Sequence, residues 1–188
     1  IALAMLKAAH ADGVPLGKIL LGDADYGRLW ELRQWCRSVD MRYGVGVHST
    51  QKVWDAGGIW TKPMTAAEYA QCVPNEEFRR ISWRAGADGE ALSARFAFLR
   101  VQVTRGGVEP VEGVTPSEWL VMEWRDGDDG PEHFYLCDLP ESATYKQLVG
   151  AIKERWRIEQ VHEELKGEVG FDHFEGRSWP GWQHHVTL

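Results

Sequence analysis

The sequence predicts an α/β fold, and three observations lead to that prediction. Helical patterns alternate with short apolar runs over residues 1–47, which is typical of a unit with parallel strands. Several β-type runs follow between residues 80 and 138, separated by clusters of Gly and Asp. A segment from Thr144 to Val169 then has an unbroken helical pattern without proline. The expected parts are residues 1–48, a β-rich insertion over residues 49–140, and residues 141–188.

The first part contains two short apolar runs that we expect to be strands. Residues 1–11 have a helical pattern that ends at Asp12 and Gly13. The runs Lys18–Gly22 and Arg42–Val47 follow, and their apolar character is typical of buried parallel strands. In such sheets the functional residues lie at the carboxyl ends of the strands. Asp23 occupies that position.

A helix is expected between these two strands, starting near Arg28. Its apolar residues recur at helical spacing, and its basic residues are expected on a polar face. The apolar positions are Leu29, Leu32, Trp35 and Cys36. The polar positions are Arg28, Arg33, Gln34 and Arg37.

The middle part is expected to be an antiparallel meander. Residues 49–79 are rich in Gly, Thr and Trp and indicate an irregular connection. Two apolar runs flank an Asp/Gly-rich loop at residues 126–130, which favours a hairpin. The expected strands are 80–84, 94–103, 118–124 and 133–136.

The segment Thr144–Val169 is expected to form one long helix with two stripes. The apolar stripe consists of Ala151, Ile158, Val161, Leu165 and Val169. The charged stripe consists of Arg155, Glu159, His162 and Lys166. Residues three or four apart on a helix lie on one face, so the charged side chains form a row.

Composition excludes several classes of protein. Apolar residues make up 44% of the 188, which is enough for a core and argues against disorder. The net charge of −7 argues against a surface that binds nucleic acid everywhere, although it leaves room for a local basic groove. No apolar run approaches the roughly 18 residues of a membrane span. Three widely separated cysteines favour reduced thiols, and we expect a cytoplasmic protein.

Asp23 and Glu159 are the candidate metal ligands. Carboxylates are hard oxygen donors suited to Mg²⁺ or Mn²⁺, and two such ions can support phosphodiester chemistry. Arg155 and Lys166 on either side of Glu159 are suited to DNA phosphates. A solvated helix face and a common strand-end Asp are the structural alternatives, and the pattern alone leaves both open.

The motifs of this chain resemble those of bacterial insertion-sequence transposases of the DDE superfamily. Arg155-x3-Glu159-x6-Lys166 is similar to the family signature Tyr-x2-Arg-x3-Glu-x6-Lys. The segment Gly170–Trp179 is similar to the one that trails the signature. LLGDADYG, residues 20–27, resembles the family's second-aspartate motif.

This resemblance implies a ribonuclease H-like core interrupted by a β-rich insertion. It also implies two Mg²⁺ or Mn²⁺ ions, with Asp23 as the second catalytic aspartate and Glu159 as the catalytic glutamate. Arg155 and Lys166 match the basic positions of the signature, which handle DNA phosphates. The implied partners are double-stranded DNA, at transposon ends and target, and a second copy in a synaptic complex.

The chain departs from the family pattern in two places. The signature Tyr falls on Ile152. The family's first aspartate belongs upstream of the first helix, and Asp12 in the turn after that helix is a poor substitute. We therefore expect an N-terminally truncated fragment of a transposase catalytic domain. The alternatives are an inactive remnant with weak DNA binding, and a metal-dependent nuclease without strand transfer.

Overall fold

The computed structural model describes residues 1–86 and 89–167. It divides into two compact units, of which the first is Ile1–Lys153 and the second begins at Glu154. Each unit is described by itself. The segment Gly170–Trp179 and position Val169, which the sequence singled out, lie outside the described residues.

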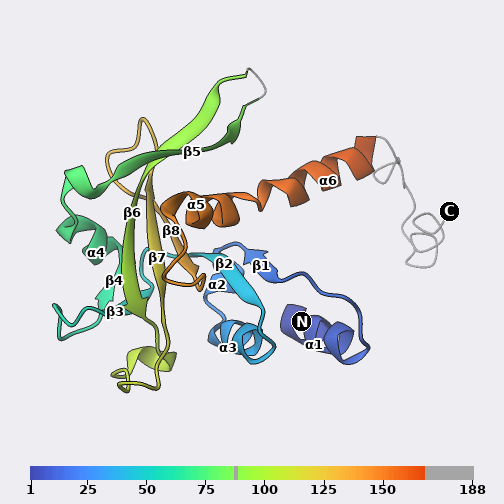
Figure 1. Cartoon of the computed structure of the whole chain (residues 1–188), viewed down its shortest axis with the longest axis horizontal. Helices are drawn as coiled ribbons and strands as arrows, with labels where there is room; N and C mark the ends of the chain where they lie inside the picture. The colour runs from blue at the N-terminus through green and yellow to red at the C-terminus, as the bar shows by residue number, and fades with distance from the viewer. Residues whose placement is uncertain (87–88, 168–188) are drawn as a thin grey trace. The chain divides into compact units, whose positions relative to one another are not determined.

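The first unit is built on one mixed sheet of eight strands (Figure 1). The strand order is β1-β2-β8-β7-β6-β3-β4, and β5 pairs with β6 outside this path. The strands are β1 (Ile19–Gly22), β2 (Arg42–Val47), β3 (Lys52–Asp55), β4 (Met64–Thr65), β5 (Arg79–Ala85), β6 (Ala91–Gln102), β7 (Ser117–Trp124) and β8 (His133–Cys137). The predicted α/β class is confirmed, and the mixed sheet is consistent with a ribonuclease H-like fold.

The predicted parallel pair is present at one end of the sheet. β1 and β2 are parallel, with Leu21 opposite Gly44. Three helices belong to this part: α1 (Ala2–Ala11), the single turn α2 (Ala24–Gly27) and α3 (Trp30–Ser38). Among the described strands, β1 pairs with β2 only, so its other edge has no strand partner.

The strands of residues 79–137 continue the same sheet. β8 is antiparallel to both β2 and β7, and β6 is antiparallel to β7 over eight residue pairs. The hairpin predicted around residues 126–130 is therefore present as β7 and β8. The predicted boundaries of the insertion, at 49 and 140, stay a prediction.

The connection from residue 49 is more ordered than its composition indicated. It contains β3, β4, the helix α4 (Ala66–Cys72) and the 3₁₀ turn η1 (Asn75–Glu77), and a second 3₁₀ turn, η2 (Arg105–Gly107), follows β6. A capping box starts α4, in which the Thr65 hydroxyl accepts from the Glu68 amide and the Glu68 carboxylate accepts from the Thr65 amide. The sequence contains the Thr65 and Glu68 spacing of this capping box, but the surrounding Gly and Thr residues favoured the prediction of an irregular connection.

The two faces of the sheet bury two separate apolar clusters. Alternating residues of β7 divide between them, with Leu120 and Met122 on one side and Trp119 and Val121 on the other. The first cluster packs against α3 and α4. The second packs against α5 (Tyr145–Lys153), which lies beside the sheet in Figure 1. The buried residues of α5 are Leu148, Val149 and Ile152.

The prediction of one continuous helix over Thr144–Val169 is wrong. The helix ends at Lys153, and a new helix, α6 (Trp156–Gly167), follows a turn at Glu154 and Arg155. The predicted apolar stripe is not a core face either, because Ile158, Val161 and Leu165 are exposed. Periodicity alone cannot detect this break, because both helices share the same spacing.

Arg33 is buried rather than part of a polar helix face. Its side chain is 2% exposed, and Nη1 lies 3.7 Å from Glu118 Oε2 on β7. Glu118 is equally buried and accepts a hydrogen bond of 2.7 Å from the Tyr43 hydroxyl. Arg37 Nη2 lies 3.4 Å from the same carboxylate. The charges compensate one another, which makes their burial tolerable.

Candidate functional site

Asp23 lies where the sequence placed it, directly after β1. It is the N-cap of α2, and its Oδ1 accepts hydrogen bonds from the amides of Asp25 (3.0 Å) and Tyr26 (3.4 Å). The side chain is exposed. The capping bonds hold the carboxylate in one orientation at the carboxyl end of a parallel strand. The position is therefore both structural and suited to a ligand.

Two glycines bring the Asp23 turn close to the neighbouring strand. A Cβ on Gly27 would lie 1.8 Å from the carbonyl oxygen of Gly46 in β2. A Cβ on Gly46 would lie 3.1 Å from the amide nitrogen of Ala24 and 3.3 Å from the carbonyl carbon of Asp23. No side chain fits between Gly27 and the β2 backbone. The backbone contact thus fixes the position of Asp23 relative to β2.

Asp25, the other acidic residue of this motif, has a different environment. Its Oδ1 lies 3.7 Å from Arg28 Nε, and both side chains are largely exposed. The only polar contact of the Asp25 carboxylate within the described residues is this ion pair. The geometry therefore favours Asp23 over Asp25 as the oriented carboxylate.

Glu159 lies in the first turn of α6 and pairs with Arg155. Arg155 Nη2 donates to Glu159 Oε1 at 2.7 Å, and both side chains are partly exposed. Lys166 lies in the last turn of the same helix and is exposed, as is His162. The structure brings Arg155 and Glu159 together. Lys166 is on the same helix, about two turns from Glu159.

The pairing of Asp23 with Glu159 stays a prediction. Asp23 belongs to the first unit and Glu159 to the second. Over residues 1–86 and 89–167, no group of three or more His, Cys, Asp or Glu side chains could hold a metal ion. The donor chemistry of the two carboxylates fits Mg²⁺ or Mn²⁺, because both are exposed oxygen donors. A complete site needs further ligands.

The position of the family's signature Tyr has a structural role in this chain. Ile152 is 5% exposed, and its Cγ2 would lie 3.2 Å from a Cβ on Gly44 in β2. The side chain therefore anchors α5 to the sheet. A tyrosine hydroxyl has no counterpart at this position.

The sequence did not predict the buried cluster of polar side chains around Glu123. Glu123 on β7 is fully buried and accepts hydrogen bonds from Lys153 Nζ (2.6 Å), the Tyr135 hydroxyl (2.7 Å) and Arg125 Nε (3.1 Å). Burial raises the pKa of Glu123, but the hydrogen bonds and the Lys153 charge outweigh it and hold that pKa below its usual value. A single Glu in a strand gives no sequence signal for such a cluster.

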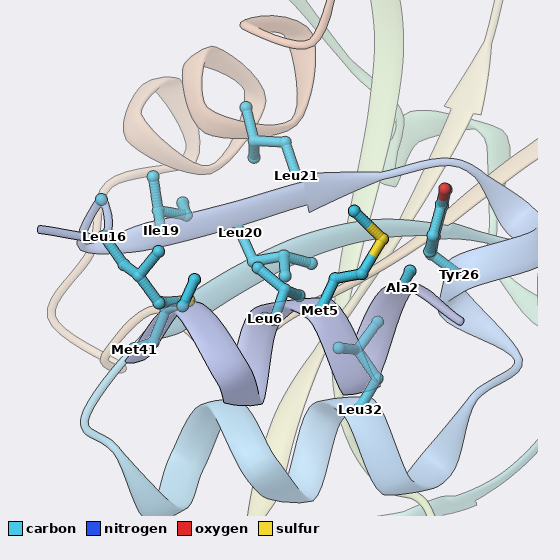
Figure 2. Close-up of a pocket in the computed structure, with 12 residues that line it drawn as sticks. Ala2, Met5, Leu6, Leu16, Ile19, Leu20, Leu21, Tyr26, Leu32 and Met41 are labelled. Atoms are coloured by element: carbon cyan, nitrogen blue, oxygen red, sulfur yellow. The ribbon is translucent and has the colours of Figure 1, made fainter. Parts of the chain in front are cut away.

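An apolar pocket of about 610 Å³ lies between α1 and β1 (Figure 2). Its lining includes Met5, Leu6, Ile19, Leu20 and Tyr26, with Tyr26 close to the Asp23 turn. Apart from the Tyr26 hydroxyl, the labelled side chains are apolar. The pocket therefore offers no acid, base or metal ligand, and the candidate chemistry lies outside it.

No helix in the described part of the chain is long and apolar enough to cross a membrane.

Comparison with known proteins supports the resemblance in the motifs of this chain. No curated protein matches the sequence significantly. The model of the family described as "Transposase DDE domain" matches residues 1–188, the whole chain. This chain therefore belongs to the transposase DDE domain family.

Proposed function

We propose that this chain is part of the catalytic domain of a transposase that cuts DNA at transposon ends and joins it to target DNA. Asp23 and Glu159 hold divalent metal, and Arg155 and Lys166 contact DNA phosphates. The observation on which the proposal rests is the family match over all 188 residues. The capped, exposed Asp23 at a strand end supports the role of the first ligand.

Two divalent ions, when bound, would activate the attacking oxygen and stabilise the leaving oxygen of the phosphodiester. In the first reaction a water oxygen attacks phosphorus, and the bond to the 3′ oxygen breaks to leave a 3′-hydroxyl. In the second, that hydroxyl attacks a target phosphate, and the target's 3′ oxygen leaves. The protein's own contribution is to place the phosphates, through Arg155 and Lys166.

The Arg155–Glu159 pair links metal binding to phosphate contact. The two residues are 44% and 60% exposed, and such a pair on a helix is worth only about 0.3–0.5 kcal/mol. A cation that takes up the Glu159 carboxylate therefore displaces Arg155 at little cost. The released guanidinium can then bind a phosphate in two-pronged fashion.

The test is a strand-transfer assay with the whole gene product. A donor duplex with a free 3′-hydroxyl and a supercoiled target should give joined products in Mg²⁺ or Mn²⁺. Glu159→Gln and Asp23→Asn should each abolish joining while leaving the protein folded by circular dichroism.

The same assay separates the alternatives. Nicked target without joined product would identify a nuclease that lacks strand transfer. DNA binding without any cleavage by the whole gene product would identify an inactive remnant. Full activity of Asp23→Asn or Glu159→Gln would show that the proposed ligands are wrong.

A further inference from the structure

A second pocket, of about 360 Å³, lies where the start of α3 meets the start of β3 and the end of β6. Four cationic side chains and one acidic side chain line it. The cations are Arg28, Arg33, Lys52 and Arg105, and the acid is Glu31. In a chain of net charge −7 this is a local excess of positive charge, which favours an anionic ligand.

Arg33 is the buried cation of the pocket. The residue is 98% buried, and neither Nε nor Nη1 donates a hydrogen bond to any described residue, although Nη1 lies 3.7 Å from Glu118 Oε2. These two nitrogens are closed to solvent, so an anion in the pocket cannot reach them without movement of neighbouring side chains. Arg33 lines the pocket, and its contribution there is positive charge and not a direct hydrogen bond from these atoms.

The N-terminus of α3 adds further donors. The helix has nine residues, and its N-cap, Leu29, makes no side-chain cap hydrogen bond. Trp30 and Glu31 of its first turn line the pocket. The first amides of a helix point out of its N-terminus and favour anions, phosphate in particular. The pocket thus combines side-chain cations with uncapped helix amides.

The other cations are only weakly engaged. Arg105 Nη2 lies 3.0 Å from Glu31 Oε1, and Arg28 Nε lies 3.7 Å from Asp25, all on exposed side chains. Lys52 is exposed and has no ion pair within the described part of the chain. Exposed pairs of this kind contribute little, so a phosphate can compete for these groups.

The pocket is connected to the Asp23 turn through Arg28, which is one of its lining residues. The end of β6 and the start of β3, which also line the pocket, lie several strands away from β1 in the sheet. Asp23 and Arg28 flank the single turn α2, roughly 7–8 Å apart along its axis. A DNA strand whose reacting phosphate lies at Asp23 can therefore place a nearby phosphate in the pocket.

We propose that this pocket binds a backbone phosphate of the DNA substrate through Arg28, Lys52, Arg105 and the N-terminus of α3, with the buried Arg33 adding positive charge. The proposal rests on the proposed function, because it takes DNA as the substrate. It adds a binding site on the first unit, whereas Arg155 and Lys166 belong to the second. Its role is to position the strand and not to take part in the chemistry.

The first experiment measures binding of the 188-residue chain to duplex DNA by fluorescence anisotropy in EDTA, over a range of salt concentrations. Lys52→Ala and Arg105→Ala should each weaken binding about fivefold at low salt. Each should also reduce the slope of log Kd against log salt by about one, as expected for one lost phosphate contact. Lys7→Ala on α1, a surface cation that does not line the pocket, is the matched control and should change neither quantity.

The second experiment uses inorganic phosphate alone and a thermal melt. Sodium phosphate should raise the Tm of the wild-type chain more than sodium chloride of equal ionic strength, and the Lys52→Ala/Arg105→Ala variant should lose that difference. Equal DNA affinity and equal phosphate stabilisation in wild type and variant would overturn the site. Phosphate stabilisation that is lost in the variant, with unchanged DNA affinity, would overturn DNA as its ligand. Absence of any DNA binding by the wild type, with the phosphate effect intact, would instead contradict the proposed function.

Discussion

Two kinds of carboxylate in this molecule have opposite environments. Glu123 is fully buried and accepts hydrogen bonds from three side chains: Lys153 of α5, Tyr135 of β8 and Arg125, which follows β7. Asp23 and Glu159 are exposed, and each is held by local partners only: the α2 amides for Asp23 and Arg155 for Glu159. The buried acid is closed to a ligand from solvent, whereas the exposed acids can exchange their partners. Burial alone is therefore a poor guide to function here.

The largest expected effect comes from breaking the buried pair. Lys153→Ala leaves Glu123 charged and buried without its closest donor, which lies at 2.6 Å. Removal of one partner from such a pair typically costs about 3–5 kcal/mol. Urea denaturation of the chain measures this loss.

Arg125→Ala is the matched control for that variant. Arg125 also donates to Glu123, at 3.1 Å, but its side chain is 50% exposed. Its removal should cost clearly less than that of Lys153. Equal losses in the two variants would show that burial does not set the strength of these contacts.

The pH dependence of stability should reveal the same cluster. The folded protein holds the pKa of Glu123 below its ordinary value of 4.5. A lowered carboxyl pKa adds stability above the unfolded value, and that stability is lost as the pH falls through the folded value. The advantage of wild type over Glu123→Gln should therefore shrink below about pH 4.5, as followed by chemical denaturation from pH 7 to pH 3. An advantage that grows on acidification would contradict the assigned direction.

Substitution of Gly27 tests the backbone contact that places Asp23. A methyl group there would lie 1.8 Å from the Gly46 carbonyl oxygen, so α2 has to move away from β2. We expect the free energy of unfolding to fall by about 1–3 kcal/mol, as for overpacked sites. We also expect weaker binding of the divalent metal proposed at Asp23. Gly150→Ala in α5 is the control, because apart from the backbone of its own helix nothing lies within 4 Å of its Cβ, and it should stabilise by about 0.5–1 kcal/mol.

The two roles of Asp23 can be separated by two substitutions. Asp23→Ala removes the N-cap and should cost about 1 kcal/mol. Asp23→Asn retains a good capping residue and should leave stability nearly unchanged. Under the proposed function both variants abolish strand transfer. Activity in Asp23→Asn but not in Asp23→Ala would reduce Asp23 to a structural residue.

The smallest effect on stability is expected at the Arg155–Glu159 pair. Glu159→Gln should change the free energy of unfolding by no more than about 0.5 kcal/mol, because the pair is exposed. Its proposed effect on strand transfer is complete loss. A complete loss of strand transfer with almost no loss of stability identifies a functional acid, whereas a structural acid such as Glu123 should mainly affect stability.

Local patterns in the sequence determined a good part of this protein. The runs Lys18–Gly22 and Arg42–Val47 predicted the parallel pair, because buried parallel strands are continuously apolar. The position of Asp23 after the first run predicted its place at the strand end. The motif around Glu159 indicated the family that the whole-chain match then showed. Each of these signals lies within a few neighbouring residues.

The tertiary structure decided what depends on contacts between distant residues. Arg33 appeared to be one more polar residue of a helix, yet Glu118, 85 positions further along the chain, allows its burial. The predicted helix breaks after Lys153, where Glu123 of β7 binds the last side chain of α5. Likewise, residues 79–137 join the sheet of β1 and β2 through the register of β8 against β2. Spacing along the chain fixes which residues share a face, but the partner of that face is set by packing between distant segments.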